Sequence, residues 1–388
     1  MIKTGLDILI KKGLPVLKGK RVGLICNQAS ITTNFDYAKD LLVNHKDFSL
    51  TCLFAPQHGY FLSERDNMDE TVDAIDPETK LNIYSLYSET RQPTKEALNT
   101  IDAIVFDIQD VGTRVYTYIW TMVLTMQACK KQNKQFIVLD RPNPINGKDI
   151  EGNLLNPHFT SFVGLLPIPM RHGMTVGELA LFFNKEFQIN CDLHVVKMQG
   201  WQRDLYLDQT GLPWAYPSTG LPTLDSSIAY AGMVLFEGTN LSEGRGTTKP
   251  FEFIGAPFIE PYSFSHKLEK EKLPGCILQP YYFKPNVNKH ASKVCGGIKI
   301  NITNRKKFKP YLTALMILRQ ALKDYKSDFS WNPPPYEYEF KKLPIDILAG
   351  NDVVRKMLEK GASQNKLKNY CHKDEVLFRK MRKKYLLY

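Results

Sequence analysis

The sequence lacks the short patterns by which nucleotides, reactive serines and catalytic metals are commonly bound. No Gly-x-Gly-x-x-Gly follows an expected strand, and Gly-x-x-x-x-Gly-Lys-Ser/Thr is absent, so a dinucleotide or nucleoside triphosphate is not expected. The absence of Gly-x-Ser-x-Gly leaves a serine hydrolase without support. No histidine pair has the His-Glu-x-x-His spacing, which disfavours a metal site. We therefore predict a protein with no cofactor and no metal.

Cysteine is sparse, and long apolar runs are missing. The seven cysteines are an odd number without a Cys-x-x-Cys pair, which is typical of a reducing compartment. No run approaches the roughly 20 apolar residues of a membrane span. The first residues lack the apolar core of an export signal. We expect a cytoplasmic protein without a membrane span, or an exported one if a signal precedes this sequence.

Charge of one sign is in excess but is not clustered. The formal net charge is +11, and the basic residues form only short runs separated by ordinary sequence. Such runs usually lie on solvated helix faces, and no Arg-rich arm or zinc-finger spacing accompanies them. We therefore expect no nucleic-acid partner. The oligomeric state is left open by these patterns.

Strands and helices are expected to alternate along the first 150 residues. The apolar patterns predict strands at 21–26, 50–54, 82–86, 103–107 and 136–139, and helices at 36–43, 94–98 and 118–131. A long irregular loop is expected over 55–79. This order predicts a parallel sheet covered by helices on both faces.

The last third of the chain has a different pattern. Strands are expected at 277–283 and 296–302, a helix at 310–323, and two basic helices after the break at 333–335. The fold class is therefore α/β. We expect a parallel-sheet domain over 1–255 that carries most of the site, and a smaller α+β domain over 256–388.

Polar residues follow the expected strands. Asn27 follows the first, Gln57 and His58 the second, and Asp140 and Arg141 the last. The carboxyl ends of parallel strands open into the ligand crevice of such sheets. A binding site is therefore expected at this edge.

The segment 106–118 delivers the densest set of polar groups, directly after an apolar strand. Asp110, Arg114, Tyr116 and Tyr118 are its candidate ligand-binding or catalytic residues. An alternative is structural: Asp107 or Asp110 caps the helix that begins near residue 117, and Arg114 is the ion partner.

A glycine-rich acidic loop occupies 237–247. Its backbone can approach a ligand closely, and Glu237, Asn240, Glu243 and Arg245 are its candidate site residues. The alternative is a tight connector held by a Glu243–Arg245 ion pair. Upstream, His172 is a further candidate, whereas Thr175 to Glu178 has the pattern of a helix capping box.

Four motifs together resemble glycoside hydrolase family 171, the NamZ-type exo-β-N-acetylmuramidases (DUF1343). They are Phe106-Asp-Ile-Gln-Asp-Val-Gly-Thr-Arg-x-Tyr-Thr-Tyr118, Leu139-Asp-Arg-Pro-Asn-Pro144, Arg171-His-Gly-Met-Thr175 and Glu237-Gly-Thr-Asn-x-Ser-Glu-Gly-Arg-Gly-Thr247. The resemblance covers essentially the whole chain. It implies a Rossmann-like domain, a smaller C-terminal domain and a cleft between them. It also implies release of N-acetylmuramic acid from the non-reducing ends of peptidoglycan fragments, as in cell wall recycling.

One position departs from the family pattern. The family carries Pro-Glu-His-Gly after the second strand, with the Glu as proposed catalytic acid/base, whereas this chain has Gln57. The flanking segment 60–67 differs as well. Loss of a general acid typically costs about 10²–10⁴ in rate.

Three functions remain open at this point. The first is a muramidase-like glycosidase that uses another carboxylate, with Asp110, Glu237, Glu243 and Glu64 as candidates. The second is a catalytically impaired relative that still binds an amino sugar. The third is a Rossmann-like enzyme acting on another small polar ligand.

Gln57, His58, Asp110, Arg114 and Glu243 are expected to line one pocket. Because N-acetylmuramic acid carries a lactyl carboxylate and Arg binds carboxylates bidentately, Arg114 or Arg245 is expected to face the cleft without a buried acidic partner.

Overall fold

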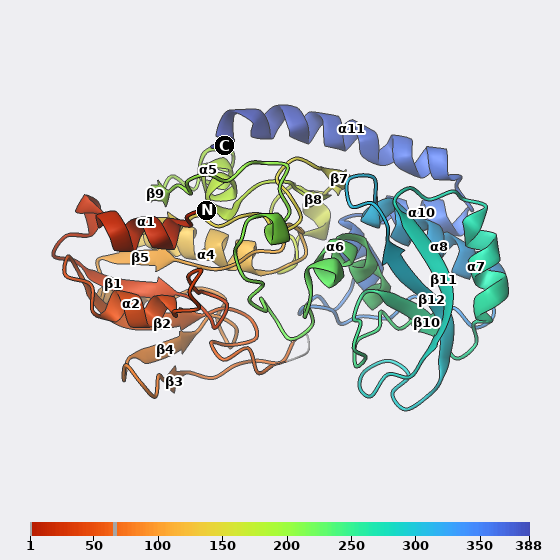
Figure 1. The fold of residues 1–388 in the computed structure, drawn as a ribbon, viewed down its shortest axis with the longest axis horizontal. Helices are drawn as coiled ribbons and strands as arrows, with labels where there is room; N and C mark the ends of the chain where they lie inside the picture. The colour runs from red at the N-terminus through yellow and green to blue at the C-terminus, as the bar shows by residue number, and fades with distance from the viewer. Residues whose placement is uncertain (1, 65–67) are drawn as a thin grey trace.

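The computed structural model describes residues 2–64 and 68–388 and has two lobes (Figure 1). The first lobe contains a seven-stranded sheet of order β3-β4-β2-β1-β5-β6-β9, in which every neighbouring pair is parallel except β3-β4. Its strands are β1 (Arg21–Ile25), β2 (Ser49–Ala55), β3 (Ala74–Ile75), β4 (Asn82–Ser85), β5 (Ala103–Phe106), β6 (Gln135–Leu139) and β9 (Asp192–Val196). The predicted parallel sheet is confirmed, although β3 lies inside the stretch expected to be one irregular loop.

Helices cover both faces of this sheet, as predicted. They are α1 (Gly5–Lys12), α2 (Ala38–Val43), α3 (Lys95–Asn99), α4 (Tyr118–Lys131) and α5 (Val176–Glu186). Along β5, Ala103 and Val105 pack in the cluster that includes α1 and α2, whereas Ile104 and Phe106 pack in the cluster that includes α4 and α5. This alternation explains why the strand reads as a continuous apolar run, since both of its faces are buried.

Helix α4 begins and ends as the sequence predicts, at Tyr118 and Lys131. Helix α5 begins with the predicted capping box, in which Thr175 and Glu178 satisfy each other's backbone N–H groups. Both helices are followed in the chain by a strand of the sheet, β6 and β9.

The second lobe is built on a three-stranded antiparallel sheet of order β10-β12-β11. Its strands are β10 (Phe253–Ala256), β11 (Cys276–Phe283) and β12 (Cys295–Ile302), and its helices are α6 (Leu224–Met233), α7 (Pro261–Glu269), α8 (Pro310–Asp324), α9 (Pro344–Ala349) and α10 (Val353–Glu359). The domain division at 255/256 stays a prediction. Helix α6 is described here with the second lobe because it packs on α8, and β10 because it pairs with β12.

The last helix, α11 (Gln364–Arg382), runs along the outside of both lobes and brings the C-terminus back beside the N-terminus (Figure 1). It packs along β7 (Glu151–Leu154), which pairs with β8 (Pro169–Arg171) in a small separate sheet. Beyond α11, the Tyr388 hydroxyl donates to Asp140 at 2.7 Å. The end of the chain thereby ties the two lobes together.

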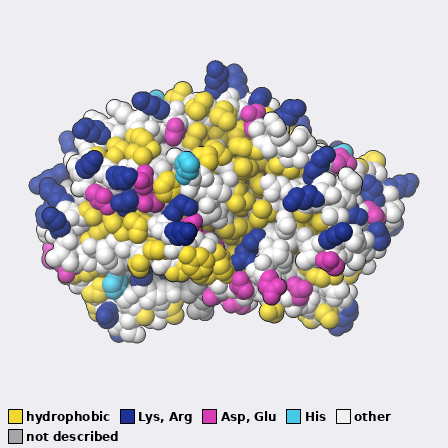
Figure 2. Space-filling model, turned by 180° about the vertical axis from the view of Figure 1, so that it is seen from behind, with side chains coloured by type: hydrophobic (Ala, Val, Ile, Leu, Met, Phe, Trp, Pro, Cys, Tyr) yellow, Lys and Arg dark blue, Asp and Glu magenta, His cyan; other side chains and the backbone are white. Residues whose placement is uncertain are grey.

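The excess positive charge is dispersed over the face of the molecule that Figure 2 shows. Figure 2 shows Lys and Arg side chains scattered over one face and interspersed with Asp and Glu, rather than gathered in one patch. Within residues 2–64 and 68–388, none of the helices combines the length and apolar character needed to cross a bilayer.

Candidate active site

A pocket lies between the two lobes at the carboxyl edge of the large sheet. The first lobe contributes the turn after β2 and the residues before α4, and the second lobe contributes the glycine-rich loop and the segment after Pro335. Its lining is made by Gln57, His58, Val115, Tyr116, Thr117, Val163, Ser218, Gly220, Leu221, Tyr230, Glu237, Arg245, Phe251, Tyr336 and Glu337. The cavity between these side chains is narrow, about 20 Å³ in volume.

Gln57 is held at the end of β2 by two neighbours. The Thr117 hydroxyl donates to Gln57 Oε1 at 2.6 Å, and Gln57 Nε2 donates to Glu337 Oε1 at 3.3 Å. The turn continues through His58 and Gly59, both with positive φ (71° and 74°). A left-handed conformation is unusual for a residue other than glycine. The chain thus turns sharply at the point where it enters the pocket.

Glu337 is an acidic side chain of the pocket that the sequence patterns did not single out. It is 3% exposed, and the Tyr87 hydroxyl donates to its Oε2 at 2.9 Å. Burial raises the pKa of Glu337 to about 7, although the hydrogen bonds from Tyr87 and Gln57 oppose the increase. A substantial part of this carboxyl is therefore protonated at neutral pH.

Glu237 has the opposite character. Arg245 Nη2 lies 2.7 Å from its Oε1, and the Tyr336 hydroxyl donates to its Oε2 at 2.5 Å. Burial alone would raise the pKa of Glu237, but the Arg245 charge and the Tyr336 hydrogen bond hold it below its ordinary value. Glu237 is therefore ionised at neutral pH.

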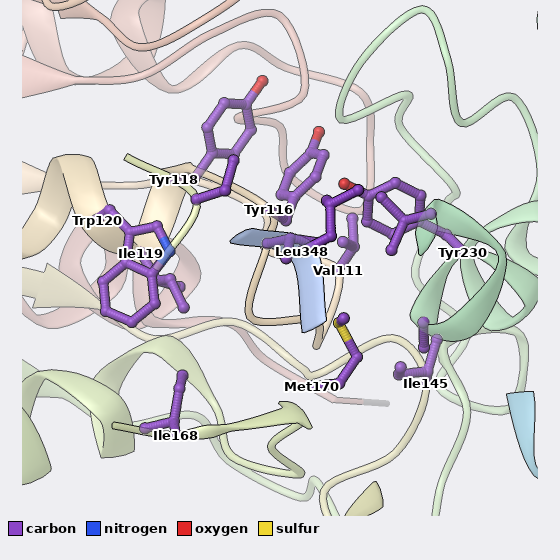
Figure 3. Packing of buried hydrophobic residues seen from close by; sticks show 14 of the residues in the cluster. Val111, Tyr116, Tyr118, Ile119, Trp120, Ile145, Ile168, Met170, Tyr230 and Leu348 are labelled. Carbon is purple, nitrogen blue, oxygen red and sulfur yellow. The ribbon is translucent and has the colours of Figure 1, made fainter. Parts of the chain in front are cut away.

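Tyrosine rings form much of the apolar wall. The Tyr116 ring lies 4.7 Å from that of Tyr118 and 6.0 Å from that of Tyr230, edge-on in both cases (Figure 3). Burial raises the pKa of Tyr116 and Tyr230 well above the ordinary value. Both phenols remain neutral and present ring surface and a hydroxyl, which suits a sugar ring.

The prediction that Arg114 faces the pocket is wrong. Its guanidinium is fully buried and donates to three backbone carbonyls, those of Asn153 (3.2 Å), Ile168 (3.1 Å) and Leu348 (2.7 Å). The last carbonyl belongs to α9 of the second lobe. Arg114 therefore connects the lobes beneath the site.

Arg245 lines the pocket, but the expectation that it lacks an acidic partner is also wrong. It pairs with Glu237, and its Nε lies 3.7 Å from Glu243 Oε1. The loop therefore lines the pocket through Glu237 and Arg245 and is also held by the Glu243–Arg245 pair; its contact with a ligand stays a prediction. A side chain at Gly220 would meet the Arg245 guanidinium at 2.7 Å, so glycine leaves room for it.

Asp110 and Glu243 are not in the lining, which corrects the expected five-residue pocket. Asp110 Oδ2 accepts from the Gly112 N–H at 2.7 Å and lies 3.4 Å from His172 Nε2. Glu243 Oε2 accepts from Lys289 Nζ at 2.8 Å. Glu64 is also outside the lining, and its backbone oxygen lies 2.9 Å from His58 Nδ1.

The remaining candidates also hold the scaffold around the site. Arg141 binds Asp107 through two hydrogen bonds of 2.6 and 2.8 Å. Asp140 accepts from Thr175, the Gly177 N–H and Tyr388. Asn27 donates to the Tyr118 hydroxyl, which donates to Pro217 O, and Asn240 donates to Asp328 O.

No metal-binding arrangement is present in the described parts of the chain, where no group of three or more His, Cys, Asp and Glu side chains could hold an ion. Of the divergent segment 60–67, residues 65–67 lie outside the described residues.

Comparison with known proteins matches the chain to one family along nearly its whole length. Residues 22–225 match the N-terminal region, and residues 228–388 the C-terminal region, of exo-beta-N-acetylmuramidase NamZ. The chain is 44% identical over 387 residues to peptidoglycan beta-N-acetylmuramidase NamZ of Bacillus subtilis (strain 168), covering 100% of this chain and 91% of that protein.

Two crystal structures share the fold. Both are DUF1343 family proteins of Bacteroides fragilis NCTC 9343. One is 34% identical with a TM-score of 0.90, and the other is 30% identical with a TM-score of 0.77. Each comparison covers 100% of this chain and 99% of the other. The two-lobed architecture is thus that of these proteins.

Proposed function

Because the chain belongs to the exo-beta-N-acetylmuramidase NamZ family of glycoside hydrolases, we propose that it releases N-acetylmuramic acid from the non-reducing end of peptidoglycan fragments. The observation that carries this proposal is the pocket between the lobes, with the ionised Glu237 held by Arg245 and Tyr336. Gln57, Glu237 and Glu337 are each less than 10% exposed. A pocket with such buried walls favours a chain end over an internal sugar.

Glu237 has a role in this chemistry. Glycoside hydrolysis passes through a transition state in which positive charge develops on the sugar ring. A preorganised carboxylate in a site shielded from water stabilises that charge more strongly than it would in bulk solvent. We propose that Glu237 faces the anomeric carbon, either stabilising the charge or attacking it.

The other pocket residues are proposed to hold the sugar. Tyr116 and Tyr230 offer ring surface, and His58 and Arg245 offer donors. Arg245 remains the proposed partner of the lactyl carboxylate even though it is already ion-paired, because a guanidinium has five N–H donors and can serve two carboxylates.

Purified protein and a chromogenic β-N-acetylmuramic acid glycoside provide the direct test. We expect turnover of this substrate and little turnover of the matching N-acetylglucosamine glycoside, which lacks the lactyl group. A preference for the N-acetylglucosamine substrate would contradict the proposed specificity.

A second function is favoured by Gln57, whose amide cannot transfer a proton as a carboxyl does. The protein would then bind the amino sugar without cleaving it. Calorimetric binding of N-acetylmuramic acid together with no release from a MurNAc-GlcNAc disaccharide would identify this case.

Gln57→Glu tests the importance of this position. The new carboxyl would lie where Gln57 Nε2 now lies 3.3 Å from Glu337, and two carboxyls this close share one proton. We expect turnover to rise, by up to about 10²-fold if a proton donor at this position limits the rate. The high-pH limit of activity should also move upward. If turnover and pH profile both stay unchanged, residue 57 is not among the reacting groups.

A further inference from the structure

We propose that Glu337 is the general acid of this site, the residue that protonates the leaving group. The assignment rests on the proposed glycosidase function and deepens it, since it names a catalytic residue on the second lobe. The carrying observation is geometric: Glu337 lines the pocket and holds Gln57 Nε2 and the Tyr87 hydroxyl with its two oxygens.

The backbone at Glu337 has an unusual conformation that positions this carboxyl. Glu337 and Tyr338 both have positive φ (45° and 63°), and neither is glycine. Such conformations cost of order 1–3 kcal/mol each and persist where the surrounding structure enforces them, which is often at functional sites. The neighbouring Tyr336 hydroxyl is bound to Glu237. A single turn therefore places one carboxyl in the pocket and orients a second.

The two carboxyls differ as an acid and a carboxylate must. Glu237 is paired with Arg245, whereas Glu337 accepts hydrogen bonds from two neutral side chains, Tyr87 and Gln57. Two titratable groups whose surroundings push their pKa values apart are the signature of divided acid and carboxylate roles. Glu237 also adds a negative charge near Glu337, while Arg91 partly opposes it. The other titratable groups lining the pocket are His58, Tyr116, Tyr230 and Tyr336.

Protonated Glu337 gives its proton to the glycosidic oxygen while the bond from that oxygen to the anomeric carbon breaks, and the bonding pair leaves with the oxygen. Ionised Glu237 stabilises the positive charge at the anomeric carbon. Water then adds to that carbon, and the proton it loses restores Glu337. The 3.3 Å bond from Gln57 is the longer of the two to Glu337, so Oε1 is the better placed oxygen to give the proton.

Glu337→Gln separates acid catalysis from a structural role. We expect hydrolysis of the MurNAc-GlcNAc disaccharide to fall by about 10²–10⁴-fold, because its sugar alkoxide cannot leave unprotonated. Hydrolysis of the 2,4-dinitrophenyl β-glycoside of N-acetylmuramic acid should change far less, because its leaving group, 2,4-dinitrophenolate, departs without a proton. Glu339→Gln is the matched control: it lies two residues away, outside the lining, and pairs with Lys342. Its activity should equal that of the wild type.

The pH profile adds a readout that misfolding cannot imitate. Because the acid must be protonated, activity should decline as pH rises through about 7, the pKa of Glu337. This decline, the high-pH limb of the profile, should be absent from the residual activity of Glu337→Gln. Tyr87→Phe provides a second variant that keeps the carboxyl. It removes a hydrogen bond that lowers the pKa of Glu337, so the limb should move to higher pH.

Each outcome decides between the two proposals. A wild type that turns over neither substrate ends the glycosidase proposal and this one with it. If the wild type is active and Glu337→Gln lowers hydrolysis of both substrates by the same factor, the assignment of Glu337 is wrong and the glycosidase proposal stands. The same holds if Glu337→Gln lowers hydrolysis of neither substrate. An unmoved limb in Tyr87→Phe also counts against Glu337, even if Glu337→Gln fails to fold.

Discussion

Glu237→Gln is expected to lower hydrolysis of N-acetylmuramic acid glycosides by about 10²–10³-fold, the typical cost of removing a preorganised charge that stabilises a transition state. Unlike loss of the acid, this loss should be similar for good and poor leaving groups, because both need the charge on the sugar ring stabilised. Stability should fall as well. Arg245 would keep only Glu243, 3.7 Å away, as a charged partner, and breaking a buried ion pair costs about 3–5 kcal/mol.

Turnover of the disaccharide and of the dinitrophenyl glycoside, together with urea unfolding, measures both effects. Glu252→Gln is a suitable control: Glu252 is also buried and pairs with a cation, Lys249, but it lies outside the pocket lining. It should lose stability while its turnover per folded molecule is retained. A Glu237→Gln variant with wild-type turnover would exclude Glu237 from the chemistry.

Arg114→Lys is expected to destabilise the protein by about 3–5 kcal/mol without changing sugar preference. The guanidinium serves carbonyls of Asn153, Ile168 and Leu348 from one fixed plane, and an ammonium cannot reproduce that geometry. Each buried carbonyl left without a donor costs about 1–3 kcal/mol. The relevant measurements are the urea midpoint and the Michaelis constants for N-acetylmuramic acid and N-acetylglucosamine substrates.

If the variant instead loses affinity for the N-acetylmuramic acid substrate selectively, at unchanged stability, Arg114 contacts the substrate after all. Arg91→Lys is the comparison for the same chemical change at a partly exposed position, where Arg91 stacks on Tyr87 and Tyr338. It should lose much less stability.

The fold of the first lobe follows from local patterns. Strand β5 and helix α4 could be placed from the sequence because a buried apolar run of four residues and a largely apolar segment of 14 residues each carry their own signal. Strand β3 was missed, since two residues within a polar stretch carry no periodicity. The domain boundary is similarly weak in sequence, because one apolar core extends through both lobes.

The site was only partly predictable, and the reason is physical. Gln57, His58, Tyr116, Glu237 and Arg245 do share a pocket, because strand ends and glycine loops have recognisable sequences. The position of Arg114 was wrongly predicted because an arginine after a strand looks the same in sequence whether its guanidinium binds a ligand or backbone carbonyls. Glu337 was missed because 333–339 reads as a proline-rich break. The only hint was an acid placed between two tyrosines, Tyr336 and Tyr338.

The hydrogen bond between Gln57 and Glu337 joins positions 280 residues apart in the chain. Contacts of such sequence separation form late in folding, because the entropy of closing the intervening chain must be overcome first. Neither lobe alone contains a complete site, however well its own sheet has formed. During refolding, enzymatic activity should therefore return after the far-ultraviolet circular dichroism signal. The delay between the two signals measures the time that the two lobes need to dock.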